Sequence, residues 1–233
     1  MSTRQLLLDR NRASIFAFEC FWGVAFPFAY YATVLPGYLK HLDAPNILIG
    51  LAPAIHSGIT ALIQPYSAYA FRPGPHRSVW LRNMYASGSV AYIALGAAVL
   101  AGFLSGTTAV VFTLLTALVF AITVGLADPH YMDLVAEAAP ADLRGRFFGL
   151  RVIFLGLGGV VGGELAEWVL GAAAPPQNFG ASLCVGGVLY VLCTQALRRF
   201  QDPPVPTPEP LPAGSFSRYL GGSLGPLALH PRF

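Results

Sequence analysis

The stretch Thr107–Met132 reads TTAVVFTLLTALVFAITVGLADPHYM and contains one formally charged side chain, that of Asp128. A helix that crosses a bilayer core of about 30 Å needs about 20 consecutive apolar residues, and this stretch is longer than that. It lacks the alternation of apolar and polar residues that a lipid-facing barrel strand requires. The stretch therefore predicts a membrane-spanning helix.

Further apolar runs of similar length follow the same pattern, at Ile15–Leu39, Ile47–Phe71, Asn83–Phe103, Phe147–Leu170 and Gly180–Leu197. Hydrophobic residues make up 55% of the chain and charged residues 11%, whereas about 25% of residues are charged in an average soluble domain. The mean hydropathy is +0.59. We expect an all-α polytopic membrane protein whose residues 1–200 form six transmembrane helices.

The remaining residues, 201–233, differ in composition from the apolar runs. Prolines recur at close intervals between Pro203 and Pro212, a density that favours extended polyproline II structure over a packed core. We interpret this segment as a proline-rich tail outside the membrane.

The positive residues indicate the orientation of the predicted helices. Twelve of the 14 Lys and Arg residues fall on one side, namely Arg4, Arg10, Arg12, Arg72, Arg77, Arg82, Arg144, Arg146, Arg198, Arg199, Arg218 and Arg232. The opposite side has Lys40, and Arg151 lies inside the fifth apolar run. Loops rich in Lys and Arg stay in the cytoplasm. We therefore expect a multi-pass protein of the cell membrane with both termini cytoplasmic.

Several classes of function find no support in the residues. The net charge of +3 follows from topology, and no basic groove predicts nucleic-acid binding. Cys20, Cys184 and Cys193 lie inside predicted helices without metal-ligand spacing, which favours a packing role. Neither a Gly-x-Ser nucleophile with a deep histidine nor a His-Glu-x-x-His motif occurs. We expect no enzyme activity, no metal and no cofactor.

Polar residues at membrane depth are the candidates for a binding site, because a charge at the bilayer centre costs about 2.5–3.5 kcal/mol on insertion scales. On the first predicted helix Glu19, Trp22, Phe26 and Tyr30 recur at spacings of three and four, so they share one face. This face either lines a cavity, or Glu19 reaches the interface and the aromatic residues pack.

The second and fourth predicted helices offer similar polar faces. His56, Thr60 and Gln64 recur every four residues, which is compatible with a proton relay or with interhelical hydrogen bonds. The fourth helix has the row Thr113, Thr116, Phe120 and Thr123. From these faces we take Gln64, Thr116, Phe120 and Thr123 as cavity candidates beside His56.

Arg151 enters the fifth predicted helix about one turn from its cytoplasmic boundary. An unpaired guanidinium there would be costly, so we expect an ion pair with Asp128 or Glu19, serving as a gate or as a structural clamp. The same helix contains Gly156, Gly158, Gly159, Gly162 and Gly163. Two overlapping G-x-x-x-G spacings predict close helix packing and also permit bending.

Three segments resemble the major facilitator superfamily of transporters. Asp133–Gly149, with Pro140 and the pair Arg144-Gly145, is similar to the connection between the family's fourth and fifth helices. Ser67–Arg77 lies where the family has Gly-x-x-x-Asp-Arg-x-Gly-Arg, and it keeps Arg72 and Gly74 but has Ser67 and Phe71 for the first glycine and the aspartate. Gly158–Gly163 is similar to the family's Gly-Pro-x-x-Gly-Gly antiporter element, with Gly159 in place of the proline.

The resemblance implies two inverted three-helix repeats that correspond to the N-terminal half of the family's fold, with residues 201–233 as the linker between halves. It implies transport of a small solute, completed by a homodimer or by a separately encoded second half, or a truncated product. A nonenzymatic membrane scaffold is the alternative. The resemblance and the charge pattern together give candidates for cytoplasmic gating and charge pairing, namely Arg72, Gly74, Arg77, Asp128, Asp133, Arg144, Arg146 and Arg151.

Overall fold

The computed structural model describes residues 3–71, 74, 76–139, 143–202, 216–217 and 219–221, with side chains described from Leu8 onward. Arg72, Arg218, Arg232, the side chain of Arg4 and the proline run at 203–212 lie outside this part of the chain. The long elements are helices, and no strand occurs among the described residues: α1 (Thr3–Ala25), η1 (Phe26–Ala29), α2 (Val34–His41), α3 (Asn46–Ala70), α4 (Arg77–Leu100), α5 (Gly106–Ala138), α6 (Arg144–Gly171), α7 (Gln177–Cys193) and η3 (Thr194–Arg199).

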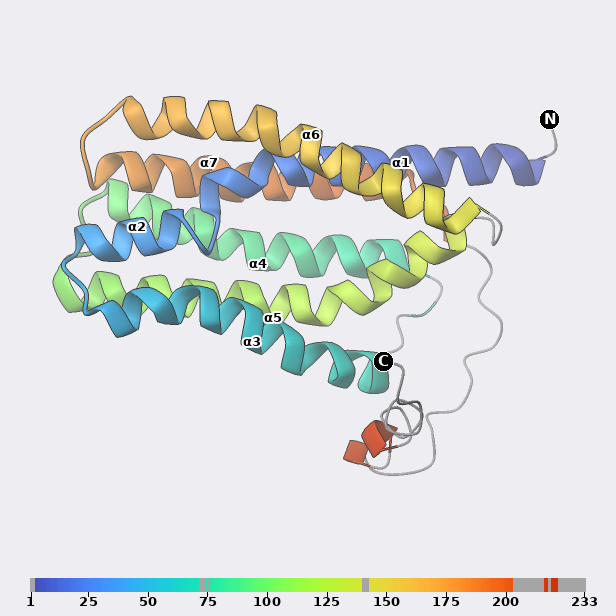
Figure 1. The fold of residues 1–233 in the computed structure, drawn as a ribbon, viewed down its shortest axis with the longest axis horizontal. Helices are drawn as coiled ribbons and strands as arrows, with labels where there is room; N and C mark the ends of the chain where they lie inside the picture. The colour runs from blue at the N-terminus through green and yellow to red at the C-terminus, as the bar shows by residue number, and fades with distance from the viewer. Residues whose placement is uncertain are drawn as a thin grey trace.

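Six spans within the described residues are long and apolar enough to cross a membrane. They lie side by side along one axis, and the chain alternates in direction from each span to the next (Figure 1). The end of α3, the start of α4, the end of α5 and the start of α6 consequently lie at the same end of the bundle as the N-terminus. The prediction of an all-α polytopic membrane protein with six spans is confirmed.

The first span, predicted as one helix over residues 15–39, is broken in the middle, where α1 is followed by η1 and then by α2. Pro27 lies in η1 and lacks the amide that would continue the helical hydrogen bonds of α1. After the break, the carbonyl oxygen of Tyr30 accepts a hydrogen bond of 2.9 Å from the amide of Val34, where α2 begins. The two pieces are offset from each other in Figure 1.

Four spans form the centre of the bundle and two lie at its periphery. The central helices α1, α4, α5 and α7 contain most of the buried residues. By contrast, α3 packs mainly on α5, and α6 packs mainly on α1. Both peripheral helices expose large apolar side chains, including Leu62 and Val160. Lipid tails are as apolar as these side chains, so such exposure is compatible with a bilayer.

The helix contacts repeat with an internal symmetry. Exchanging the first three spans for the last three turns the α3–α5 contact into the α6–α1 contact, and the α4–α5 contact into the α7–α1 contact. The α4–α7 contact maps onto itself. Because equivalent spans run in opposite directions (Figure 1), this is the pattern of two inverted three-helix repeats.

Glycines allow α1 and α6 to approach closely, but only some of the predicted ones do so. A Cβ on Gly158 would overlap the carbonyl oxygen of Cys20, and one on Gly162 would overlap that of Val24. In the described part of the chain, a Cβ on Gly156, Gly159 or Gly163 would meet no atom within 4 Å, so close approach does not require glycine there. The backbone of Gly159 is nevertheless part of the contact, because a Cβ on Gly23 would lie 2.9 Å from its nitrogen. The helical period explains the difference, since residues 158 and 162 share one face.

Candidate functional site

A cavity of about 210 Å³ lies among the spans. Both charged and aromatic side chains surround it. Its lining residues come from α1, η1, the break in the first span, α3, α4, α5 and α6: Phe18, Glu19, Trp22, Phe26, Tyr31, His56, Tyr85, Phe120, Val124, Asp128, Tyr131, Met132, Arg151 and Leu155.

A buried ion pair joins the two helices at the edge of this cavity. The Nε of Arg151 on α6 lies 2.6 Å from Oε1 of Glu19 on α1. The hydroxyl of Tyr131 donates a hydrogen bond of 2.7 Å to the same carboxylate oxygen. Glu19 is only 3% exposed, so its charge depends on these partners. The predicted ion pair of Arg151 is confirmed, with Glu19 as its counter-ion.

A second carboxylate, that of Asp128 on α5, lines the cavity with neutral partners. The hydroxyl of Tyr85 donates to its Oδ1 at 2.8 Å, and the Nε2 of Gln64 donates to its Oδ2 at 3.2 Å. Two donors satisfy the carboxylate without neutralising it. Asp128 thus lies at the same cavity as the Glu19–Arg151 pair.

The polar residues His56, Thr60 and Gln64 of α3 make two different kinds of contact. Thr60 and Gln64 donate hydrogen bonds to α5, to the carbonyl oxygen of Ala121 and to Asp128. The ring of His56 instead stacks on that of Tyr31, with 3.8 Å between centroids. Within the described residues its buried Nδ1 has no hydrogen-bond partner. The interhelical role therefore describes Thr60 and Gln64, while His56 presents an unsatisfied nitrogen at the cavity.

Aromatic rings make up much of the remaining wall. Trp22 lies 5.1 Å from Tyr85 and 6.2 Å from Phe120 between ring centroids, and its plane is within 19° of that of Phe120. Tyr31 lines the cavity and Tyr30 does not. Because the helix of the first span ends before this point, the spacing that starts at Glu19 no longer places residue 30 on the same face. This corrects the prediction for Tyr30.

Two threonines of α5 also differ from expectation. Thr116 is buried, and the hydroxyl of Thr123 donates a hydrogen bond of 2.9 Å to the carbonyl of Phe120 in its own helix. Neither lines the cavity.

The sequence pattern did not predict Phe18, Tyr85 and Tyr131 as lining residues. Phe18 is adjacent to Glu19 in the sequence. Tyr85 and Tyr131 donate hydrogen bonds to carboxylates on other helices, and no short-range spacing in the sequence predicts such contacts.

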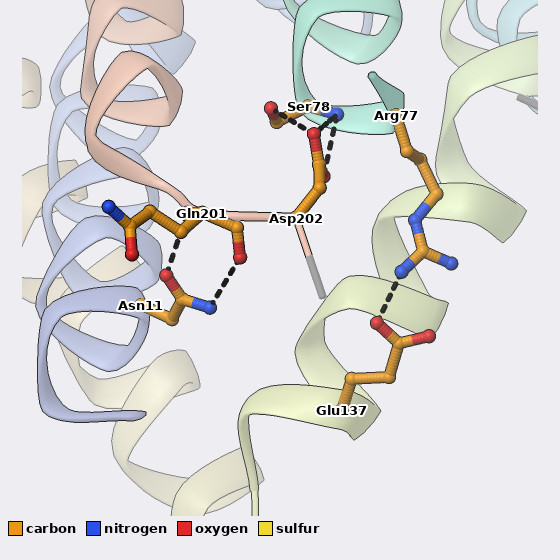
Figure 2. A network of polar contacts seen from close by, with 6 residues as sticks. All are labelled: Asn11, Arg77, Ser78, Glu137, Gln201 and Asp202. Carbon is orange, nitrogen blue, oxygen red and sulfur yellow. Dashed lines mark hydrogen bonds and ion pairs between the residues drawn. The ribbon is translucent and has the colours of Figure 1, made fainter. Parts of the chain in front are cut away.

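A separate polar network connects the helix ends on the positively charged side of the bundle (Figure 2). Arg77, at the start of α4, forms an ion pair with Glu137 near the end of α5. The carboxylate of Asp202 accepts hydrogen bonds from the amide of Ser78 at 3.1 Å and from its hydroxyl at 2.8 Å. The charge pattern of the sequence indicated Arg77 but neither of the acidic side chains, Glu137 and Asp202.

The first helix is attached to the same network. The Nδ2 of Asn11 donates to the carbonyl oxygen of Gln201 at 3.0 Å, and the amide of Gln201 donates to Oδ1 of Asn11 at 2.9 Å. Figure 2 shows this pair beside the contact between Asp202 and Ser78. The segment that follows η3 is thereby held against both α1 and α4.

The other predicted gating residues are spread over this end of the bundle. Gly74 lies in the connection between α3 and α4, and Arg72 is outside the described residues. The side chains of Asp133, Arg144 and Arg146 are exposed. Arg146 lines a small cavity of about 160 Å³ with Arg12 and the apolar residues Phe16, Leu143, Phe147 and Leu150.

Comparison with known proteins identifies the family. Searches of the curated proteins and of the solved structures return no match to this chain. A family model described as the Major Facilitator Superfamily matches residues 2–163, a range that contains every residue of the cavity between Phe18 and Leu155. Since the match covers more than half of the chain, this protein belongs to the Major Facilitator Superfamily, a family of membrane transporters.

Proposed function

We propose that the cavity between α1, α3, α5 and α6 is one wall of the pathway along which this chain carries a small solute. The observation on which this rests is the convergence, among apolar spans, of the Glu19–Arg151 ion pair, the carboxylate of Asp128 and the unsatisfied nitrogen of His56. Ionisable groups at membrane depth are costly and typically mark a substrate or ion pathway.

A second six-helix unit completes the pathway in this proposal. Alternating access requires one unit to rock against another around a site that both line. Here the cavity is flanked by the peripheral helices α3 and α6, whose apolar surfaces are available for such a partner. Three sources of the partner are distinguishable: a second copy, a separately encoded chain, or further residues of a longer form of this chain.

Self-association tests the first source. Two differently tagged copies are expressed together, and one tag is used for purification from mild detergent. Recovery of the second tag in a stable one-to-one ratio supports a homodimer. If the copies do not copurify, the second unit comes from another chain or from a longer form of this one.

We also propose that residues 1–200 form the membrane domain, that residues 201–233 form a cytoplasmic linker, and that the protein resides in the cell membrane. Arg77 and Arg144 begin α4 and α6 at the end of the bundle where the chain starts, and Arg198 and Arg199 are the last residues of η3. Lys40 lies close to the opposite end, near the end of α2. Such asymmetry favours a cytoplasmic location for the Arg-rich end.

The transport proposal is tested by binding and flux. Small cationic, neutral and anionic solutes are screened for thermal stabilisation of the purified protein, and those that bind are then tested for counterflow in liposomes. We expect both signals to weaken in Asp128→Asn and to persist in Glu164→Gln, a control at an exposed carboxylate of α6. Flux that does not respond to Asp128→Asn would count against this cavity. Stable capture of a protein partner without solute flux would favour a scaffold.

A further inference from the structure

The charges around the cavity do not cancel. Three formally charged side chains line it, and the ion pair between Arg151 and Glu19 uses the single cation among them. The third, Asp128, has only the neutral donors Tyr85 and Gln64 as hydrogen-bond partners in the described part of the chain. By formal charge at neutral pH, counting histidine as uncharged, the lining side chains therefore have one negative charge in excess of the positive one, and Asp128 is the carboxylate without a paired cation.

The rest of the wall suits a cation that also has apolar surface. Trp22, Tyr31 and Phe120 line the same cavity as Asp128. The face of an aromatic ring is the negative part of its quadrupole, so it attracts a cation placed over it, with tryptophan the strongest of the three ring types. Phe18, Phe26 and Val124 add apolar surface. A metal ion fits this wall less well, because no cluster of three or more His, Cys, Asp or Glu side chains that could hold one occurs among the described residues.

The volume limits the size of the bound group. About 210 Å³ is less than the roughly 300–1,000 Å³ typical of sites for drug-sized ligands. This wall thus accommodates a compact group, such as one ammonium with its substituents and a single ring.

From these observations we propose that the transported solute is a small organic cation, a quaternary or protonated amine, whose charge lies against Asp128 and whose apolar part lies against Trp22 and Phe120. This inference rests on the proposed transport function and adds the class of substrate to it. The Glu19–Arg151 pair borders the site without supplying net charge.

The test compares three probes of similar size on the purified full chain: benzyltrimethylammonium, N-benzylacetamide and phenylacetate. Their affinities are measured by isothermal titration calorimetry in detergent. We expect the cation to bind at least tenfold more tightly than the neutral amide, and the anion to bind most weakly.

Two variants locate the interaction. Asp128→Asn removes the charge but keeps the size of the side chain and one of its two acceptor oxygens. It is therefore expected to reduce cation affinity at least tenfold and to change amide affinity less than twofold. Trp22→Leu is expected to reduce cation affinity at least threefold. Glu164→Gln removes the same charge at an exposed position of α6 and is expected to bind all three probes as the wild type does. Thermal unfolding verifies that each variant is folded.

The outcomes separate this inference from the proposed function. Equal binding of cation and amide, preference for the anion, or a cation preference that survives Asp128→Asn would each overturn the organic-cation assignment. In those cases, binding that is weakened by Trp22→Leu still locates a solute site in the cavity. If none of the three probes binds to the wild type, the cation assignment is also wrong, whereas the solute screen and the flux assay decide the transport proposal separately.

Discussion

Arg151 and Glu19 stabilise each other in a place where neither charge would be tolerated alone. Glu19 is almost completely buried and Arg151 lies over the ring of Tyr131, with 5.8 Å between the guanidinium carbon and the ring centroid. Removing one member of a buried pair leaves an uncompensated charge, which typically costs about 3–5 kcal/mol, whereas replacing both members is much less costly.

We therefore expect Arg151→Met to lower the free energy of unfolding by about 3 kcal/mol, and Glu19→Gln/Arg151→Met to lower it by at least 1 kcal/mol less than the sum of the single changes. The free energies of unfolding of Arg151→Met, Glu19→Gln and the double variant are measured by denaturant unfolding in detergent. Additive single and double changes would show that the two side chains do not depend on each other.

Asp202 acts on α4 from a distant part of the sequence. Its carboxylate accepts a hydrogen bond from the amide of Ser78, the second residue of the helix. An amide at this position has no hydrogen-bond partner within the helix itself. Loss of a capping side chain typically costs about 0.5–2 kcal/mol.

Replacing Asp202 with Ala is thus expected to lower stability by about 1 kcal/mol and to accelerate amide exchange at Ser78. Asp202→Asn, which keeps an acceptor oxygen, should lie between the wild type and Asp202→Ala. Glu164→Ala, an exposed change on α6, serves as the control. Unchanged exchange at Ser78 in Asp202→Ala would contradict the capping role.

At the scale of helices, the contact between α1 and α6 offers a matched pair of substitutions. Gly162 faces the backbone of α1 at Val24, while Gly163 is the next residue and faces open space in the described structure. The same methyl group therefore has opposite surroundings at neighbouring positions.

We expect Gly162→Ala to lower stability by about 1–3 kcal/mol, the usual cost of overpacking. Gly163→Ala should be neutral or stabilise by up to about 1 kcal/mol, because alanine favours a helix more than glycine does. Thermal unfolding of the two variants checks the difference, and similar effects at both positions would mean that α1 and α6 are not in close contact at Val24.

At the scale of the whole molecule, the orientation in the membrane is open to a direct test. His76 and Ala173 are exposed and lie in connections at opposite ends of the bundle. On intact cells, a membrane-impermeant maleimide should label Ala173→Cys, and it should label His76→Cys only after permeabilisation. The native cysteines lie within the spans, so the unmodified protein provides the background. The reverse pattern would place the Arg-rich end outside the cell.

The fold was largely predictable from the chain, whereas the site was predictable only in part. Apolar run length reports on the bilayer directly, so all six spans were found, although the break at Pro27 in the first span was not. Helical spacing placed Glu19, Trp22 and Phe26 on the cavity face. The same spacing failed for Tyr30, because the helix that would have continued it ends at the break.

Local properties of the sequence therefore determined the number of spans, their alternating direction and the need for a partner at Arg151, since each follows from the cost of exposing charge or backbone to lipid. Only the tertiary structure decided that Glu19 is that partner, that Tyr85 and Gln64 hold Asp128, and that Asp202 caps α4. These contacts join residues far apart in the chain. They depend on how the helices rotate and pack against one another, which short-range spacing does not specify.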